Sequence, residues 1–144
     1  DLEQGFFDQW ALRGIAEEAV IAIRVLAHWL SFGPLLMIAA IPASALLGLD
    51  GKTLAIVEWG LLAGTPGLAA IGVTIAALTA GLRAGAALSG LLLIPLATPL
   101  LIFGAGALST GGQSGIALTA AISLVLIAIA PFAGGAAVRA AREG

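Results

Sequence analysis

Cysteine and tyrosine are absent from this sequence of 144 residues, and histidine and methionine each occur once. Without cysteine the chain forms no disulfide, holds no thiolate zinc cluster and offers no thiol nucleophile. Charge is scarce as well, because Asp, Glu, Lys and Arg make up 10% of the residues, against roughly 25% in an average soluble domain. So little charge cannot cover a folded surface that faces water. We therefore expect lipid to surround most of the chain.

Apolar residues are correspondingly abundant, at 60% of the chain, and the mean hydropathy is +1.13. A bilayer core needs about 20 apolar residues per helix. The uncharged run between Arg83 and Arg139 is too long for one span, and "STGGQSG" at 109–115 is typical of a turn that divides it. The sequence predicts an all-α transmembrane bundle over 25–144 with four spans, at about 25–49, 59–82, 86–108 and 116–138.

Residues 1–24 differ from the rest and form a separate predicted segment. Apolar residues recur in it at helical spacing, whereas Arg13, Glu17 and Arg24 fall on another face. This pattern favours an amphipathic helix at the membrane surface, and the alternative is a charged extension of the first span. The chain begins with Asp1 and has no basic region leading into an apolar one, so we expect a fragment whose N-terminal part is missing.

The arginines predict the orientation. All five lie on one side of the predicted spans: Arg13, Arg24, Arg83, Arg139 and Arg142. The positive-inside rule makes that side cytoplasmic, so both ends of the chain are expected inside, with Arg24, Arg83 and Arg139 as cytoplasmic anchors. The tryptophans lie near predicted membrane–water interfaces: Trp10, Trp29 and Trp59.

Chemically active groups are few. "GKT" at 51–53 lacks the earlier glycine of a phosphate loop and joins two predicted spans, so any ATPase must be another subunit. His28 is a weak candidate for a heme ligand or proton relay, and the alternative is a polar tip that reaches the headgroups. The chain offers no nucleophile–base pair and no metal-ligand set. We predict a non-enzymatic subunit that binds no metal or cofactor by itself.

The prolines all fall within predicted spans: Pro34, Pro42, Pro66, Pro95, Pro99 and Pro131. Each removes a backbone hydrogen bond and tends to kink its helix. The predicted kink and packing positions are Gly64, Thr65, Pro66, Pro95, Pro99 and Pro131. Two interpretations remain open: simple bending to fit neighbouring helices, or a helix that moves or re-enters.

Several strings together resemble one known family. They are "VLAHW" at 25–29, "LLAGTPGLAAIGVTIAALTAGLRAG" at 61–85, "LLLIPLATPLLIFGAGA" at 91–107 and "PFAGGAAVR" at 131–139. The chain is similar over nearly its whole length to the heme exporter protein B family, the CcmB-type permeases of bacterial cytochrome c maturation. It has Ile94 before Pro95 where the family pattern has leucine.

The start of the chain is similar to a segment of the wider ABC-2-type permeases. That segment, "DxxxGxxEQLxxxP", is cytoplasmic and docks on the ATPase. In "DLEQGFFDQWALRG" at 1–14, three residues match it: Asp1, Gly5 and Gln9. Asp8 takes the acidic position and Trp10 the leucine position, while Gly14 replaces the proline. The resemblance implies ATPase coupling through Gly5, Asp8, Gln9 and Trp10. The family has six spans, so this fragment would lack the first two.

The resemblance implies a permease subunit in the bacterial inner membrane for heme export or delivery. The implied partners are an ABC ATPase, a heme-handling membrane protein, a small membrane adaptor and a periplasmic heme chaperone, with heme as the handled ligand and no nucleic acid. Either heme crosses through this subunit, or ATP hydrolysis drives release of the loaded chaperone. The alternatives are a permease for a lipid, polysaccharide or drug, and a non-transporting assembly scaffold.

Overall fold

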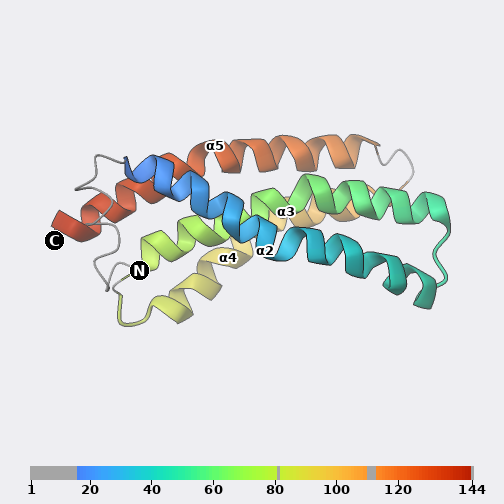
Figure 1. Ribbon diagram of the computed structural model, residues 1–144, viewed down its shortest axis with the longest axis horizontal. Coiled ribbons are helices and arrows are strands. Elements are labelled where there is room, and N and C mark those ends of the chain that lie inside the picture. The colour runs from blue at the N-terminus through green and yellow to red at the C-terminus, as the bar shows by residue number, and fades with distance from the viewer. Residues whose placement is uncertain (1–15, 81, 110–112, 144) are drawn as a thin grey trace.

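The computed structural model describes residues 16–80, 82–109 and 113–143. These residues form four helices and no strand: α2 (Glu17–Leu46), α3 (Gly51–Thr79), α4 (Gly85–Gly106) and α5 (Gln113–Glu143) (Figure 1). All four are long and apolar enough to cross a membrane. The prediction of an all-α polytopic membrane bundle is therefore confirmed.

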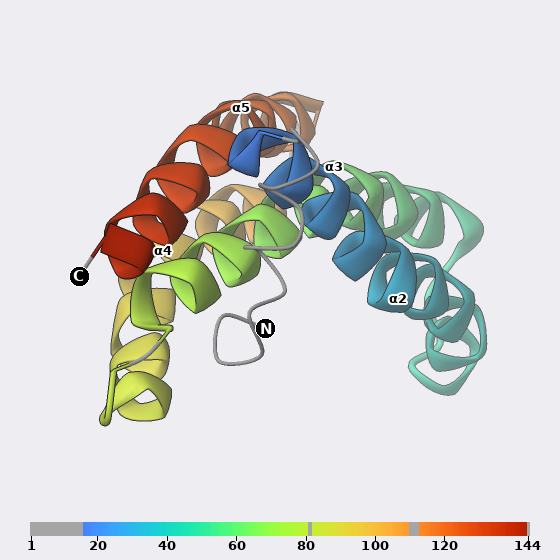
Figure 2. The same cartoon turned by 60° about the vertical axis from the view of Figure 1, so that its left-hand side comes forward.

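The helices α3 and α5 pack against each other, and each also packs against α2 and α4. Successive helices run in opposite directions, so the start of α2, the turn between α3 and α4, and the end of α5 lie at one end of the bundle (Figure 1). We call this the arginine end, and the opposite one the Asp50 end. Figure 2 shows that the end of α2 and the start of α4 splay away from α5 at opposite ends of the bundle.

The core of the bundle is built mainly from small and β-branched side chains. On α3, Ala69, Ala70 and Ile71 are almost fully buried, and the core cluster continues through Ile21 of α2 and Val138 of α5. Lipid tails are as apolar as leucine, so close van der Waals packing of small residues is what favours helix association in a membrane. Large apolar side chains instead cover the outer surfaces, as lipid contact requires.

All four helices begin before the predicted spans, whereas α2, α3 and α4 end two or three residues earlier than predicted and α5 ends later. Residues 17–24 form the first turns of α2 and continue into the first span without a break. Helix α3 begins at Gly51, before the predicted start at residue 59, because Asp50 caps it by accepting a hydrogen bond from Thr53 N at 2.8 Å. The division at residue 24 between a cytoplasmic segment and a membrane domain stays a prediction.

All six prolines lie inside helices, as predicted. Helix α3 runs without interruption through "GTPG" at 64–67, so the re-entrant interpretation is wrong for this stretch of the structure. Pro66 removes the hydrogen bond that its position would otherwise give to the carbonyl of Leu62. The bending and the moving interpretations are both compatible with a continuous helix.

Candidate functional site

Charges from the two ends of the described chain meet at the arginine end. Arg139 of α5 forms a charge-assisted hydrogen bond with Glu18 of α2, and Arg142 forms one with Glu17. Arg139 Nη1 also lies 3.6 Å from Glu17 Oε2. We call these four residues the clasp. Its acids lie in the first turn of α2 and Arg142 in the last turn of α5, where each sign of charge complements the helix dipole.

The other predicted anchors lie around the same end. Arg83 is exposed on the turn between α3 and α4, and Arg24 is half-buried farther along α2. Beside that turn, Thr79 and Ser89 share a hydrogen bond of 3.0 Å between their hydroxyl oxygens. The arginine end thus collects Arg83 and Arg139, as the sequence predicts. Their role as cytoplasmic anchors stays a prediction.

A second cluster lies at the middle of α3, at the predicted kink. Trp29 of α2 donates a hydrogen bond from Nε1 to Thr65 Oγ1 at 2.8 Å. Thr65 is 2% exposed, and its hydroxyl in turn donates to the carbonyl of Leu61 at 2.6 Å. Gly64 approaches α5, because a Cβ atom there would lie 3.2 Å from Thr119 Cγ2. Adjacent residues of this predicted kink, Gly64 and Thr65, therefore contact the helices on both sides of α3.

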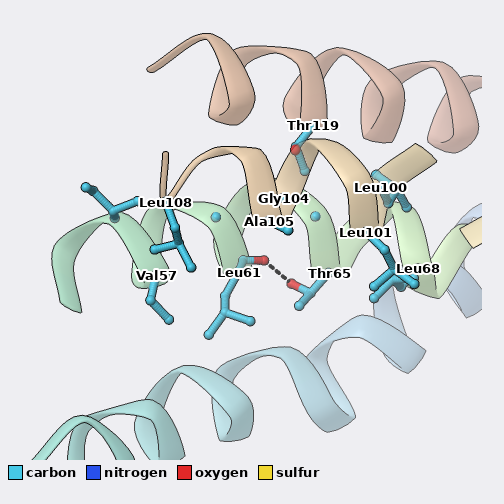
Figure 3. Close-up of a pocket in the computed structure, with 13 residues that line it drawn as sticks. Val57, Leu61, Thr65, Leu68, Leu100, Leu101, Gly104, Ala105, Leu108 and Thr119 are labelled. Atoms are coloured by element: carbon cyan, nitrogen blue, oxygen red, sulfur yellow. Dashed lines mark hydrogen bonds between the residues drawn. The ribbon is translucent and has the colours of Figure 1, made fainter. Parts of the chain in front are cut away.

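The first half of α3, the second half of α4 and Thr119 of α5 line an apolar cavity of about 340 Å³ at the Asp50 end (Figure 3). A Cβ atom at Gly60 or Gly104 would meet nothing within 4 Å, so these glycines leave space open. The two lining hydroxyls are already bonded within their own helices, since Thr119 donates to the carbonyl of Gly115 at 2.8 Å and Thr65 to that of Leu61. The lining therefore offers apolar contact and no charge.

Two buried polar atoms have no hydrogen-bond partner among the described residues: one carboxylate oxygen of Glu58 and the hydroxyl of Ser123. Ser123 is 3% exposed and fills the contact between α5 and Gly67 of α3, where a Cβ atom would lie 2.5 Å from Ser123 Oγ. We find no pattern in the sequence that points to Ser123. Glu58 lies on α3 and directly follows Val57, which lines the cavity.

His28, the weak heme-ligand candidate, is exposed on α2. Its ring stands edge-on to Phe32, with 5.3 Å between the ring centroids, and its Nε2 lies 3.5 Å from where a Cβ atom of Gly72 would be. No three His, Cys, Asp or Glu residues come together as metal ligands within residues 16–80, 82–109 and 113–143. A heme role for His28 stays a prediction.

The structure separates the remaining predicted kink positions. Pro95 and Pro99 lie on α4, and Pro131 lies on α5 after the buried Ala130. The predicted coupling residues Gly5, Asp8, Gln9 and Trp10 lie outside the described residues.

The sequence analysis did not predict the clasp, although acids and arginines near the predicted cytoplasmic side were a signal that could have indicated ion pairs there. It also placed Trp29 at an interface, whereas the structure bonds it to the middle of α3.

Known proteins match this chain over almost its full length. The family described as CcmB protein matches residues 1–141. Proteins named heme exporter protein B are similar at 42% identity in Paracoccus denitrificans and 40% in Rhodobacter capsulatus, in each case over 96% of this chain and 66% of the relative. A third, from Pseudomonas aeruginosa, is 37% identical over 92% of this chain and 62% of its own length.

The chain thus spans slightly less than two thirds of the length of these relatives. Its four apolar helices and the match over 1–141 make it a multi-pass membrane protein. The chain belongs to the CcmB protein family.

Proposed function

We propose that this chain is part of the membrane permease subunit of an ABC-type complex that exports or delivers heme for cytochrome c maturation. The observation that carries the proposal is the family match over residues 1–141, together with relatives named heme exporter protein B. In this proposal heme is the cargo of the complex, and a separate subunit hydrolyses ATP.

The start of α3 supports a separate ATPase. The "GKT" residues form the first turn of α3, and the backbone N–H of Thr53 is already bonded to the Asp50 carboxylate at 2.8 Å. A phosphate loop needs such N–H groups free to bind phosphate, and a carboxylate at that place would repel it. Nucleotide binding therefore belongs to a partner.

The proposed orientation places the arginine end in the cytoplasm of a bacterium, because the positive-inside rule assigns arginine-rich turns to that side. Helix α2 starts at this end, and residues 1–14 precede it in the sequence. Gly5, Asp8, Gln9 and Trp10 would dock on the ATPase there. The apolar cavity would then lie toward the periplasm.

The chemistry of the cavity favours a mechanical role over heme passage through this chain alone. Heme needs an iron ligand and partners for its propionates, and the lining supplies neither. A heme-handling membrane protein, assisted by a small membrane adaptor, would ligate the iron, and this subunit would couple ATP hydrolysis to release of the loaded periplasmic chaperone.

The test uses the full-length gene in a bacterium whose own copy is deleted, with c-type cytochromes quantified by heme staining. Restored cytochromes, lost again in an Asp8→Ala/Trp10→Ala variant that is still inserted, are the expected result. An inserted protein that restores no cytochrome would overturn the heme assignment and favour a permease for another substrate. Normal cytochrome levels in the double variant would overturn the coupling role of residues 1–14.

A further inference from the structure

The clasp joins parts of the chain that are far apart in sequence. The Arg139–Glu18 hydrogen bond spans 121 positions, and the Arg142–Glu17 bond spans 125. It connects the first turn of α2 to the last turns of α5. Figures 1 and 2 show these two helix ends beside each other.

Two glycines below the clasp bring the helices close. A Cβ atom at Gly134 would lie 3.0 Å from Ile21 Cγ2, and one at Gly135 would lie 3.3 Å from both side-chain and backbone atoms of Glu18. Ile21 and Val138 are almost fully buried in the same contact. The ion pairs of the clasp therefore lie next to a tightly packed apolar contact between α2 and α5.

The clasp arginines remain partly exposed: the side chains of Arg139 and Arg142 are 42% and 31% accessible. Exposed ion pairs contribute little to folding stability, whereas a network with correct geometry fixes orientation and register. The buried contact beneath already holds the helices together. The added effect of the clasp is to fix the position of the first turn of α2 against the last turns of α5.

We propose that Arg139 and Arg142 are positioning residues that hold the first turn of α2 to α5, so that a displacement of the segment before α2 moves both helices as one unit. This inference rests on the proposed function, because the displacing force is that of the ATPase. Helix α5 also packs on α3 and α4. The clasp would thus connect the segment before α2 directly to α5, one of the two described helices that contact all the others.

The first experiment compares Arg139→Gln with Arg83→Gln in the full chain, assembled with its ATPase. Both variants remove one arginine at the same end, but Arg83 lies on the exposed turn between α3 and α4. We expect Arg139→Gln to keep its membrane level and ATP hydrolysis while c-type cytochromes fall about tenfold, a size typical of coupled pairs. Arg83→Gln should leave all three unchanged. Normal cytochromes in Arg139→Gln, or a parallel loss of ATP hydrolysis and protein level, would overturn the proposal.

The second experiment replaces the ionic connection by a covalent one. The chain has no cysteine, so a Glu18→Cys/Arg139→Cys variant can be cross-linked selectively with a short bismaleimide once native cysteines elsewhere in the full protein are removed. We expect the uncross-linked variant to hydrolyse ATP without delivering heme, and cross-linking to restore delivery. Delivery that stays absent after cross-linking would overturn the proposal, and absence of a cross-link would contradict the contact itself.

These outcomes separate the two proposals. If the wild-type gene restores no cytochrome, the heme function fails. Cross-linking of positions 18 and 139 still tests whether α2 and α5 are joined in the membrane, because that reaction needs no heme and no ATP.

Discussion

The indole of Trp29 donates a hydrogen bond to the hydroxyl of Thr65 across the contact between α2 and α3, with 2.8 Å between Nε1 and Oγ1. Gly33 leaves room for the indole, since a Cβ atom there would lie 2.6 Å from Nε1. The bond lies at the middle of α3, beside Pro66. This polar contact joins α2 to α3 next to Pro66, which has no backbone N–H to donate a helical hydrogen bond.

We expect Trp29→Phe to destabilise the protein by about 1 kcal/mol, the usual size of an interhelical hydrogen bond in a membrane. Unfolding in lipid bicelles would measure the change. Trp59→Phe is the matched control, because Trp59 is 61% exposed. Thr65→Val should add little to Trp29→Phe in a double-mutant cycle, and full additivity of the two effects would contradict the bond.

Gly67 marks a backbone approach between α3 and α5. We expect Gly67→Ala to cost about 1–3 kcal/mol, the usual range for overpacking, because the new Cβ atom would lie 2.5 Å from Ser123 Oγ and 3.0 Å from Ser123 Cα. Gly60→Ala is the control, since its Cβ atom meets nothing within 4 Å. Thermal unfolding in detergent compares them, and equal melting temperatures for the two variants would show that α5 is free to shift.

Asp50 gives a pH-dependent start to α3. Hydrogen bonds from the side chain and the backbone N–H of Thr53 hold the pKa of Asp50 below its ordinary value. A lowered folded-state pKa means that the cap stabilises the helix above the unfolded pKa of about 3.9 and is lost as the pH falls through the folded one. Thr53→Val should therefore raise the pKa of Asp50, measured by carboxyl carbon NMR, and Thr53→Ser should not. The same pKa in both variants would contradict the side-chain bond.

The Pro66→Ala variant distinguishes two hypotheses: a permease whose α3 helix moves, and a static assembly scaffold. Alanine supplies the missing N–H to the Leu62 carbonyl, so we expect α3 to be at least as stable as before. If flexibility at this position serves transport, c-type cytochromes should fall several-fold at an unchanged membrane level. A scaffold would keep them normal, so heme staining of Pro66→Ala cells beside Pro99→Ala cells decides between the two.

The membrane helices could be predicted from the sequence because hydropathy alone determines where lipid is tolerated. Their ends could not, since these depend on single side chains: the carboxylate of Asp50 moves the start of α3 to Gly51. The continuity of α2 across residue 24 was likewise open, because a charged first turn fits a surface helix and an extended span equally well.

The contacts between helices were beyond sequence reasoning. All four helices are apolar on most sides, so no stripe of side chains indicates which faces meet. Trp29 lies beside polar His28 and suits an interface, and only the packing of Gly33 and Thr65 shows why it lies between helices. The clasp was partly accessible, because the predicted topology already placed Glu17, Glu18, Arg139 and Arg142 on one side of the membrane.

The pairing of α3 with α5 has a consequence for biosynthesis. Helix α5 is the last of the four described helices to leave the ribosome, after α4 has been made. Until it is inserted, the side of α3 that packs on α5 has only lipid to contact, while its other sides already meet α2 and α4. Insertion and assembly are therefore separate events in time, and a nascent chain that stalls after α4 is fully inserted yet has no completed core. Such a chain is the form that membrane proteases and chaperones would meet.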